Sequence, residues 1–238
     1  MLNSSFYPAG KKLPIRYGLF LTLVLLVVFA GLFACSDRSS SVDNPSVAQQ
    51  ETDLGFDTIA AVGDSLTAGY GVGEEQAYPA LLEKRLLRDG YFIRVVNAGI
   101  SGETSSGILS RIEWVIGSLK PDIVILETGA NDGLRGVDPT LIQENIERVV
   151  TILRENGISV LLAGMRIPPN LGRDYTTRFA DLYKKIADKH EISLMPFFLK
   201  SVAGDRRYIL ADGIHPNAQG YGLILDDIYP YVLEALKP

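Results

Sequence analysis

Short apolar runs rich in β-forming residues alternate with segments of helical periodicity from residue 57 to the end of the chain. A strand, a helix and a second strand in succession pair most readily as a parallel βαβ unit. The alternation therefore predicts one α/β domain built on a parallel sheet. The predicted strands are 58–63, 91–97, 122–128, 158–163 and 192–198. The predicted helices are 79–87, a segment from Thr104 or Ser105 to the break at Lys120-Pro121, 139–156, 179–190 and 217–236, the last disturbed at Pro230.

The third predicted strand says most about the sheet. Residues 122–128 read Asp-Ile-Val-Ile-Leu-Glu-Thr, a near-continuous apolar run. Strands with this pattern are buried on both faces, as in parallel sheets that helices cover on both sides. We therefore expect a doubly wound, five-stranded sheet between two layers of helices. Ligands of such folds bind at the carboxyl ends of the strands, so the loops after strands are expected to hold the functional residues.

Residues 1–34 have the pattern of an export signal, because a basic flank precedes an uncharged apolar run. The run ends in Leu32-Phe33-Ala34-Cys35, which resembles the bacterial lipobox, where the cysteine is acylated and becomes the new N-terminus. At about 18 residues, the run also reaches the lower limit for a spanning helix. An uncleaved membrane anchor is therefore the alternative to a lipoprotein.

Both interpretations hold the rest of the chain at a membrane, in the cell envelope, facing the periplasm or the cell exterior. We expect a signal peptide at 1–34, lipidation of Cys35, and a flexible tether at 35–56, which is polar, rich in serine and aperiodic. The globular domain is expected at 57–238. Acyl chains contribute about 0.8 kcal/mol per buried methylene, so a multiply acylated cysteine anchors stably.

The charge and the scarce residue types exclude several functions. The net charge is −5, and residues 1–34 contain basic but no acidic side chains, so the remainder is more acidic still. An acidic chain without a basic stripe argues against nucleic acid as a partner. Cys35 is the only cysteine, and His190 and His215 are the only histidines. They supply no recognisable metal cage, and we expect neither a metal nor a cofactor.

The loop after the first predicted strand contains a candidate nucleophile. It reads Gly63-Asp64-Ser65-Leu66-Thr67-Ala68-Gly69-Tyr70-Gly71. Ser65 is placed to point out of the sheet toward the next helix, whose N-terminal amides favour negative charge. The alternative is that Ser65 only caps this helix and the glycines form a turn. The segment alone does not decide between the two.

The last predicted loop supplies a base. It reads Asp212-Gly213-Ile214-His215-Pro216-Asn217. A serine nucleophile needs a base within hydrogen-bonding distance, and the base needs an acceptor that fixes its tautomer. Asp212, three residues before His215, can fold back to be that acceptor, although an Asp at a helix entry is often only a cap. His190 is expected at a helix C-terminus in a structural role, so His215 is the candidate base.

Four blocks of sequence together resemble those of the GDSL, or SGNH, hydrolases. The resemblance covers residues 57–238 and is nearest to the branch of bacterial thioesterase I, lysophospholipase L1 and arylesterase. It implies the three-layer α/β/α sandwich of that family, with a flavodoxin-like sheet. The blocks are Gly-Asp-Ser-Leu at 63–66, Asn-Ala-Gly-Ile-Ser-Gly-Glu-Thr at 97–104, Gly-Ala-Asn-Asp at 129–132 and Asp-Gly-Ile-His-Pro-Asn at 212–217.

The resemblance implies a role for each matching position. Ser65 would be the nucleophile, His215 the base and then the acid, and Asp212 the carboxylate that orients the imidazole. The oxyanion hole would consist of the backbone N–H groups of Ser65 and Gly102 and the side-chain amide of Asn131. Taken alone, Gly102 would be an ordinary turn glycine and Asn131 an Asx-turn residue after a strand.

We therefore predict a serine esterase that forms an acyl-enzyme on Ser65. Its expected substrates are fatty acyl or aryl carboxylic esters, including lysophospholipids and, in vitro, acyl thioesters. Two alternatives stay open: a carbohydrate O-acetyl esterase, and a non-catalytic envelope lipoprotein. Residues 165–175, rich in Pro, Gly and Asn, form either a mobile loop over the acyl site or an ordinary surface loop.

Overall fold

The computed structural model describes residues 58–237, which contain a five-stranded sheet. Its order is β2-β1-β3-β4-β5, and every neighbouring pair is parallel. The chain winds from β1 to one edge and then, through β3, toward the other, so the predicted doubly wound sheet is confirmed. The strands are β1 (Thr58–Gly63), β2 (Arg94–Gly99), β3 (Ile123–Glu127), β4 (Ser159–Ala163) and β5 (Ser193–Met195).

Three of the sequence-based predictions fall on other parts of the chain. The signal peptide at 1–34, the lipidation of Cys35 and the tether at 35–56 lie outside the described residues. They stay predictions, as does the start of the domain at residue 57. Between residues 58 and 237, none of the helices combines the length and the apolar character that crossing a membrane requires.

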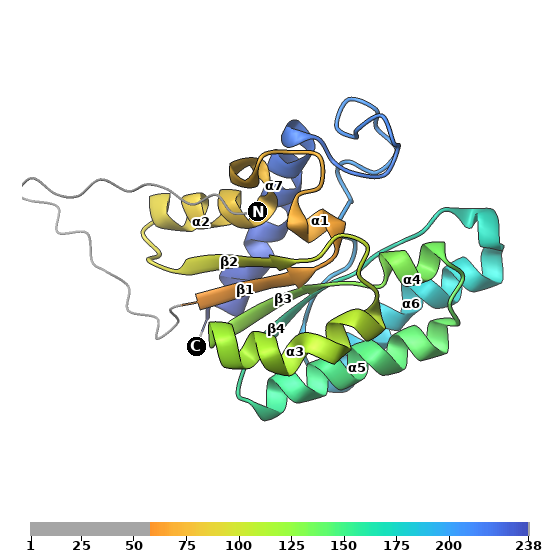
Figure 1. Cartoon of the computed structure of the whole chain (residues 1–238), viewed down its shortest axis with the longest axis horizontal. Coiled ribbons are helices and arrows are strands. Elements are labelled where there is room, and N and C mark those ends of the chain that lie inside the picture. The colour runs from red at the N-terminus through yellow and green to blue at the C-terminus, as the bar shows by residue number, and fades with distance from the viewer. Residues whose placement is uncertain (1–57, 238) are drawn as a thin grey trace, which may run out of the picture. The chain divides into compact units, whose positions relative to one another are not determined.

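Helices cover both faces of the sheet (Figure 1). Two longer helices, α2 and α7, lie with the short α1 on one face, and α3, α5 and α6 lie on the other. The helices are α1 (Ser65–Ala68), α2 (Tyr78–Arg88), α3 (Ser105–Leu119), α4 (Ala130–Leu134), α5 (Pro139–Glu155), α6 (Arg173–His190) and α7 (Ala218–Ala235), with 3₁₀ turns at Glu74–Gln76 and Pro169–Leu171. The predicted α/β/α sandwich is confirmed.

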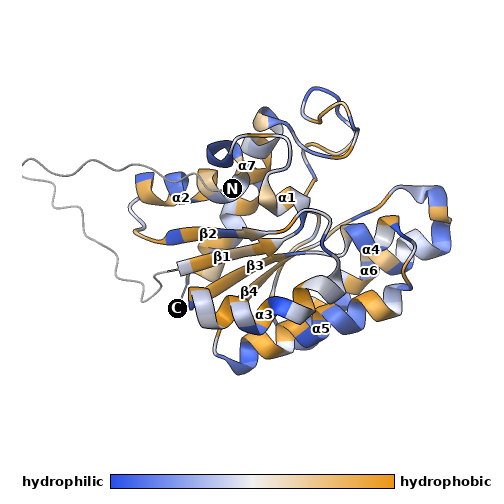
Figure 2. Ribbon diagram, in the orientation of Figure 1, coloured by the Kyte–Doolittle hydropathy of each residue, from blue (hydrophilic) through white to orange (hydrophobic). Residues whose placement is uncertain are grey.

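The centre of the core is the pair of strands that the apolar pattern picks out. Every residue of β1 and of β3 is buried, and both strands are coloured as hydrophobic along much of their length in Figure 2. Burial on both faces explains why these strands show no alternation of polar and apolar residues. One buried member of β3 is not apolar, however: Glu127, at the carboxyl end, is 0% exposed.

The strands that depart most from the predicted ranges are β2, which spans 94–99 instead of 91–97, and β5, which spans 193–195 instead of 192–198. The backbone N–H of Tyr91 donates to the Leu86 carbonyl and so completes the end of α2, which delays β2 until Arg94. At the other edge, the N–H of Ile192 likewise donates to the Ala187 carbonyl at the end of α6. Pro196 has no N–H with which to continue the ladder, so β5 ends at Met195.

One prediction about the last two helices needs correction. Helix α6 begins at Arg173, six residues before the predicted start. The apolar pattern does not reveal this earlier start, because the first turns of the helix are polar and show no apolar stripe. The end of the predicted 165–175 loop is therefore helical, and the Tyr175 hydroxyl ties it to the Val137 carbonyl at 2.6 Å. Helix α7 continues through Pro230 to Ala235, although Pro230 has no N–H to donate to the helix backbone.

Candidate active site

Ser65 is the first residue of α1, directly after the carboxyl end of β1. Asp64, not Ser65, caps this helix: its Oδ1 accepts a hydrogen bond from the Leu66 backbone N–H at 2.9 Å. The Ser65 hydroxyl is therefore not the N-cap of this helix. The simple N-cap interpretation of Ser65 is wrong, because the preceding aspartate fills that role.

The loop before α7 folds back on itself around Asp212. The Oδ1 atom of Asp212 accepts hydrogen bonds from the backbone N–H groups of Ile214 at 2.9 Å and His215 at 3.0 Å. Gly213, which follows Asp212 directly, has φ +78°, a backbone conformation that favours glycine. The N–H of Leu210 donates to the His215 carbonyl at 2.7 Å. These contacts hold the His215 side chain over α1.

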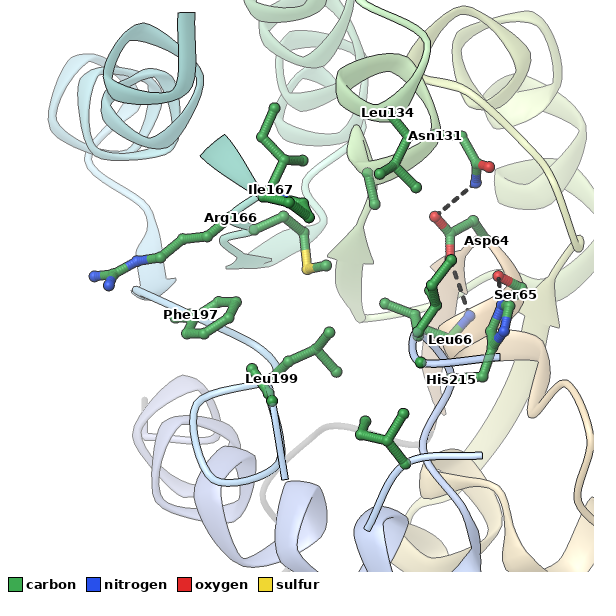
Figure 3. A pocket seen from close by; sticks show the side chains of 18 residues that line it. Asp64, Ser65, Leu66, Asn131, Leu134, Arg166, Ile167, Phe197, Leu199 and His215 are labelled. Carbon is green, nitrogen blue, oxygen red and sulfur yellow. Dashed lines mark hydrogen bonds between the residues drawn. The ribbon is translucent and has the colours of Figure 1, made fainter. Parts of the chain in front are cut away.

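The two distant loops meet at the imidazole of His215 (Figure 3). Its Nδ1 lies 2.7 Å from Asp212 Oδ2, and its Nε2 lies 2.9 Å from Ser65 Oγ. A carboxylate beside Nδ1 assigns the proton to that nitrogen, which leaves Nε2 to accept the serine proton. The structure thus brings together Ser65, His215 and Asp212, three residues that the sequence places in two separate loops.

Asp212 is held in its ionised form. The backbone N–H groups of His215 and Ile214, and then the His215 ring, lower the pKa of the Asp212 carboxyl to about 2. Hydrogen bonds to the charged form stabilise it, and a side chain that is 36% exposed loses little of its hydration. A permanent negative charge next to Nδ1 favours the imidazolium that forms whenever His215 accepts a proton.

Asn131 lines the site from helix α4, and Gly102 lies in the loop between β2 and α3. Asn131 lies in α4, and its Nδ2 donates both to Asp64 Oδ2 at 2.9 Å and to the Glu103 carbonyl at 3.0 Å. Gly102 has φ +81°, its carbonyl accepts from Arg135 Nη2 at 3.1 Å, and no atom lies within 4 Å of the position of a Cβ. Both amide protons of Asn131 have acceptors, so an oxyanion would have to share one of them.

Buried polar contacts hold the loop that carries Gly102. Arg111 makes a two-pronged ion pair with Glu103, both N···O distances being 2.6 Å, and also donates to the Ala98 carbonyl at 2.8 Å. Asp132 accepts from the backbone N–H of Ser105 at 2.8 Å and from its hydroxyl at 2.7 Å. Together with the hydrogen bond from Asn131 Nδ2 to the Glu103 carbonyl, which joins the second and third sequence blocks, these contacts fix the position of Gly102 relative to α4.

Beside Ser65 and His215 lies a cavity of about 550 Å³ with mainly apolar walls. Figure 3 shows the polar groups gathered at one end and Arg166 at the other, pointing away from Ser65. The Arg166 guanidinium stacks 5.2 Å from the centre of the Phe197 ring. The apolar side chains that line the cavity include Leu134, Met165, Ile167, Leu199 and Ile214. Among residues 58–237, no three His, Cys, Asp or Glu side chains are grouped so as to hold a metal ion.

The profile of the GDSL-like Lipase/Acylhydrolase family matches residues 61–223, a span that includes all four sequence blocks. The chain belongs to this family. Its predicted membership is thereby confirmed, and so is the prediction that this GDSL-like hydrolase is a serine esterase.

Three relatives agree with this assignment. Esterase TesA of Pseudomonas aeruginosa is 41% identical over 76% of this chain and 88% of its own length. An arylesterase of Vibrio mimicus is 38% identical over 68% and 80% of the two chains. Thioesterase 1/protease 1/lysophospholipase L1 of Escherichia coli is 36% identical over 71% and 80%. A crystal structure of TesA matches with a TM-score of 0.73 at 40% identity, over 75% of this chain and 99% of that one.

The structure of this GDSL-like hydrolase adds two residues that the sequence analysis missed. Tyr70 is 52% exposed, and its ring centre lies 4.5 Å from that of His215, with the two ring planes tilted by 41°. Nothing in the glycine-rich loop signals this contact. Glu127 contacts Asp64 and Thr67 near the nucleophile. A charged residue in an otherwise apolar strand is a signal that could have drawn attention to Glu127.

Proposed function

We propose that this GDSL-like hydrolase cleaves carboxylic esters through an acyl-enzyme on Ser65, with His215 as the proton carrier and Asp212 as its orienting carboxylate. The observation that carries the proposal is the hydrogen-bonded chain from Ser65 Oγ through His215 to Asp212, with steps of 2.9 and 2.7 Å. A weakly nucleophilic hydroxyl gains reactivity when a correctly oriented base lies at this distance.

The proton movements follow from the tautomer. Ser65 Oγ attacks the ester carbonyl carbon while His215 Nε2 takes the hydroxyl proton. The tetrahedral oxyanion then collapses, the C–O bond to the leaving group breaks, and the imidazolium returns the proton to the departing alcohol. A water molecule next attacks the acyl-enzyme and gives its proton to Nε2. Collapse of the second tetrahedral species releases the acid, and Ser65 regains its proton.

The oxyanion would be stabilised by three N–H donors. We assign this role to the backbone N–H groups of Ser65 and Gly102 and to the Asn131 amide. Gly102 has no side chain to block an approach to its backbone, and an amide donor keeps its protons at neutral pH. When the oxyanion forms, the Asn131 proton now donated to the Glu103 carbonyl or to Asp64 would turn partly toward it.

The apolar cavity supports an extended acyl chain as the group bound next to Ser65. Cavities of several hundred Å³ with apolar walls bury the apolar part of a ligand, and the few polar groups orient the reacting atoms. Fatty acyl esters, including lysophospholipids, aryl esters and acyl thioesters fit this description, and the relatives carry names of these classes. A carbohydrate O-acetyl esterase would use little of the apolar wall.

Hydrolysis of a series of p-nitrophenyl esters tests both the mechanism and the substrate class. The domain from about residue 55 is expected to hydrolyse butyrate to decanoate esters with a higher kcat/KM than acetate, because each added methylene buried contributes about 0.8 kcal/mol. Activity confined to the acetate ester would contradict the acyl-chain assignment. Hydrolysis by Ser65→Ala at the wild-type rate would refute the mechanism.

We also propose that Cys35 is acylated and anchors the domain in the cell envelope. The support is the sequence order of basic flank, apolar run, Leu32-Phe33-Ala34-Cys35 and polar tether. A mass spectrum of the protein extracted from membranes tests this proposal. The expected N-terminus is Cys35 carrying acyl groups, and an intact, unmodified N-terminal segment would rule out lipoprotein processing.

A further inference from the structure

Glu127 lies next to the nucleophile, but the mechanism above does not use it. Its side chain is completely buried at the carboxyl end of β3. Its Oε2 accepts hydrogen bonds from the Asp64 backbone N–H at 3.2 Å and from the Thr67 hydroxyl at 3.0 Å. Asp64 precedes Ser65, and Thr67 follows it by two positions. One carboxyl oxygen thus holds the backbone turn on both sides of the nucleophile.

Gly63 provides the space for this carboxyl group. A Cβ atom at position 63 would lie 2.1 Å from Thr67 Oγ1 and 2.7 Å from Glu127 Oε2. Real Cβ contacts are never so short, so a side chain here would push the carboxyl group away from the turn. The first residue of the Gly-Asp-Ser-Leu block is therefore a glycine because the Thr67 hydroxyl and both the backbone carbonyl and the carboxyl group of Glu127 occupy the neighbouring volume.

Asp64 links Glu127 to Asn131. Its Oδ1 accepts from the Leu66 N–H at 2.9 Å and its Oδ2 from Asn131 Nδ2 at 2.9 Å. Glu127 Oε2 in turn accepts from the Asp64 backbone N–H, so the two buried carboxyl groups lie side by side at one turn. Two ionised carboxylates in one buried site repel each other, so one of the two groups is expected to carry a proton.

The surroundings place that proton on Glu127. The titratable groups that face it are Asp64, Tyr78 on α2, Tyr183 on α6 and Tyr221 on α7, and burial raises the pKa of all three tyrosines. Within the part of the chain that the structure describes, neither Glu127 nor Asp64 forms an ion pair with a lysine or arginine. The nearby His215 ring lowers the pKa of Asp64 to a lesser degree than burial raises it.

The hydrogen bonds of the two carboxyl groups also favour Glu127 over Asp64 as the protonated group. Glu127 Oε1 has no hydrogen-bond partner among the described protein atoms, whereas both oxygens of Asp64 accept from N–H donors. An ionised carboxylate is strongly disfavoured in an apolar setting without a partner. Burial raises the pKa of Asp64, and it raises the pKa of Glu127 well above its ordinary value.

We propose that Glu127 is a positioning residue that keeps its proton during turnover and, by accepting the Asp64 backbone N–H, holds Asp64 and with it the Asn131 amide at the reaction site. The acidic cluster then carries one negative charge instead of two. A second charge would oppose the oxyanion forming at Ser65 and would repel Asp64 from the turn. The inference rests on the proposed function, since the position of Asn131 matters only if an oxyanion forms.

The protonation state can be observed without measuring activity. In the intact protein labelled with ¹³C at the glutamate carboxyl carbons, NMR at neutral pH is expected to show one glutamate carboxyl in its protonated form. That signal should vanish in Glu127→Gln. The matched control is Glu147→Gln, which removes a glutamate paired with Lys189 at 2.6 Å on the outer helices and should leave the signal in place. If every glutamate carboxyl is ionised, the proposal is wrong.

Kinetics then test the positioning role. Glu127→Gln is expected to keep a near-wild-type kcat, because its amide is uncharged like the protonated acid and its oxygen can still accept from the Asp64 N–H and the Thr67 hydroxyl. Glu127→Leu removes all of these hydrogen bonds and should lower kcat by about 10²-fold at unchanged KM, as expected when one oxyanion donor is misplaced. Equal losses in both variants would mean that the glutamate charge is required, and wild-type rates in both would mean that it positions nothing.

Two further readouts keep the test decisive. If Glu127→Leu does not fold, the pH profile of kcat replaces it: the wild type should lose activity at alkaline pH as Glu127 ionises, and Glu127→Gln should not. A shared alkaline decline would contradict the proposal. A wild-type protein without Ser65-dependent hydrolysis would refute the proposed function instead, while leaving the NMR result on Glu127 intact.

Discussion

Two aspartates lie one hydrogen bond away from the reacting groups, and their environments are opposite. Asp64 is 1% exposed, and burial raises its pKa. Asp212 is 36% exposed in its side chain, and hydrogen bonds from the backbone N–H groups of His215 and Ile214 lower its pKa to about 2. One belongs to a buried cluster at the end of the central strands, and the other to a surface loop.

The contrast separates two physical tasks. Asp212 must be charged, because it stabilises the imidazolium of His215, and an exposed loop with N–H donors allows that charge at little cost. The buried cluster must hold geometry, and rigidity there comes from burial and from the contacts of Glu127 with residues on either side of Ser65. The site therefore combines a charged, exposed half with a buried half that limits its own charge.

The largest expected effect comes from breaking the link between the two halves. Ser65→Ala and His215→Ala should each lower kcat by about 10⁶-fold, and the double variant should be hardly worse, because triad residues act as a unit. Single-turnover assays with a p-nitrophenyl ester measure this. Additive losses in the double variant would show that His215 does not act through Ser65.

Asp212→Asn isolates the charge of the exposed half. The amide can still accept the backbone N–H groups, but it no longer carries a charge and can leave the imidazole in the wrong tautomer. A similar change in a serine protease lowers kcat by about 10⁴-fold, so we expect a loss near that size. Steady-state kcat is the measurement. A loss below tenfold would mean that orientation alone, without charge, suffices.

Asn131→Ala tests the donor that the buried half holds. Removing one oxyanion donor typically lowers kcat by about 10²–10³-fold, and KM should change little. Asn156→Ala is a suitable control, since its amide donates only to the Ile152 carbonyl at the end of α5. An unchanged kcat in Asn131→Ala would show that this amide only bridges Asp64 and the Glu103 carbonyl.

The same contrast explains what the sequence could predict. Ser65, Asp212 and His215 are found in short, local blocks, and β1, β3 and the Thr104 cap of α3 follow from local pattern. The contacts of Glu127 with Asp64 and Thr67 join positions about sixty residues apart, so no local pattern reports them. The start of α6 was missed for a related reason, because a polar first turn has no periodicity.

The smallest expected effects are on stability, and the two halves should give pH dependences of opposite sign. Folding favours ionised Asp212, so its contribution is present above about pH 4 and is lost as the pH falls toward its pKa of about 2. Asp212→Asn lacks that dependence. Because the side chain is exposed, the difference should stay below about 1 kcal/mol.

Folding instead favours protonated Glu127, whose pKa is raised, so the wild type should lose stability as the pH rises above the ordinary glutamate value. Glu127→Gln has no proton to lose, and its stability relative to the wild type should increase between about pH 5 and pH 8, by at most about 1.4 kcal/mol per pH unit. Urea unfolding of both variants across this range and below about pH 4 measures the two slopes. If both variants gave slopes of the same sign, the distinction between a charged loop and a neutral buried acid would be wrong.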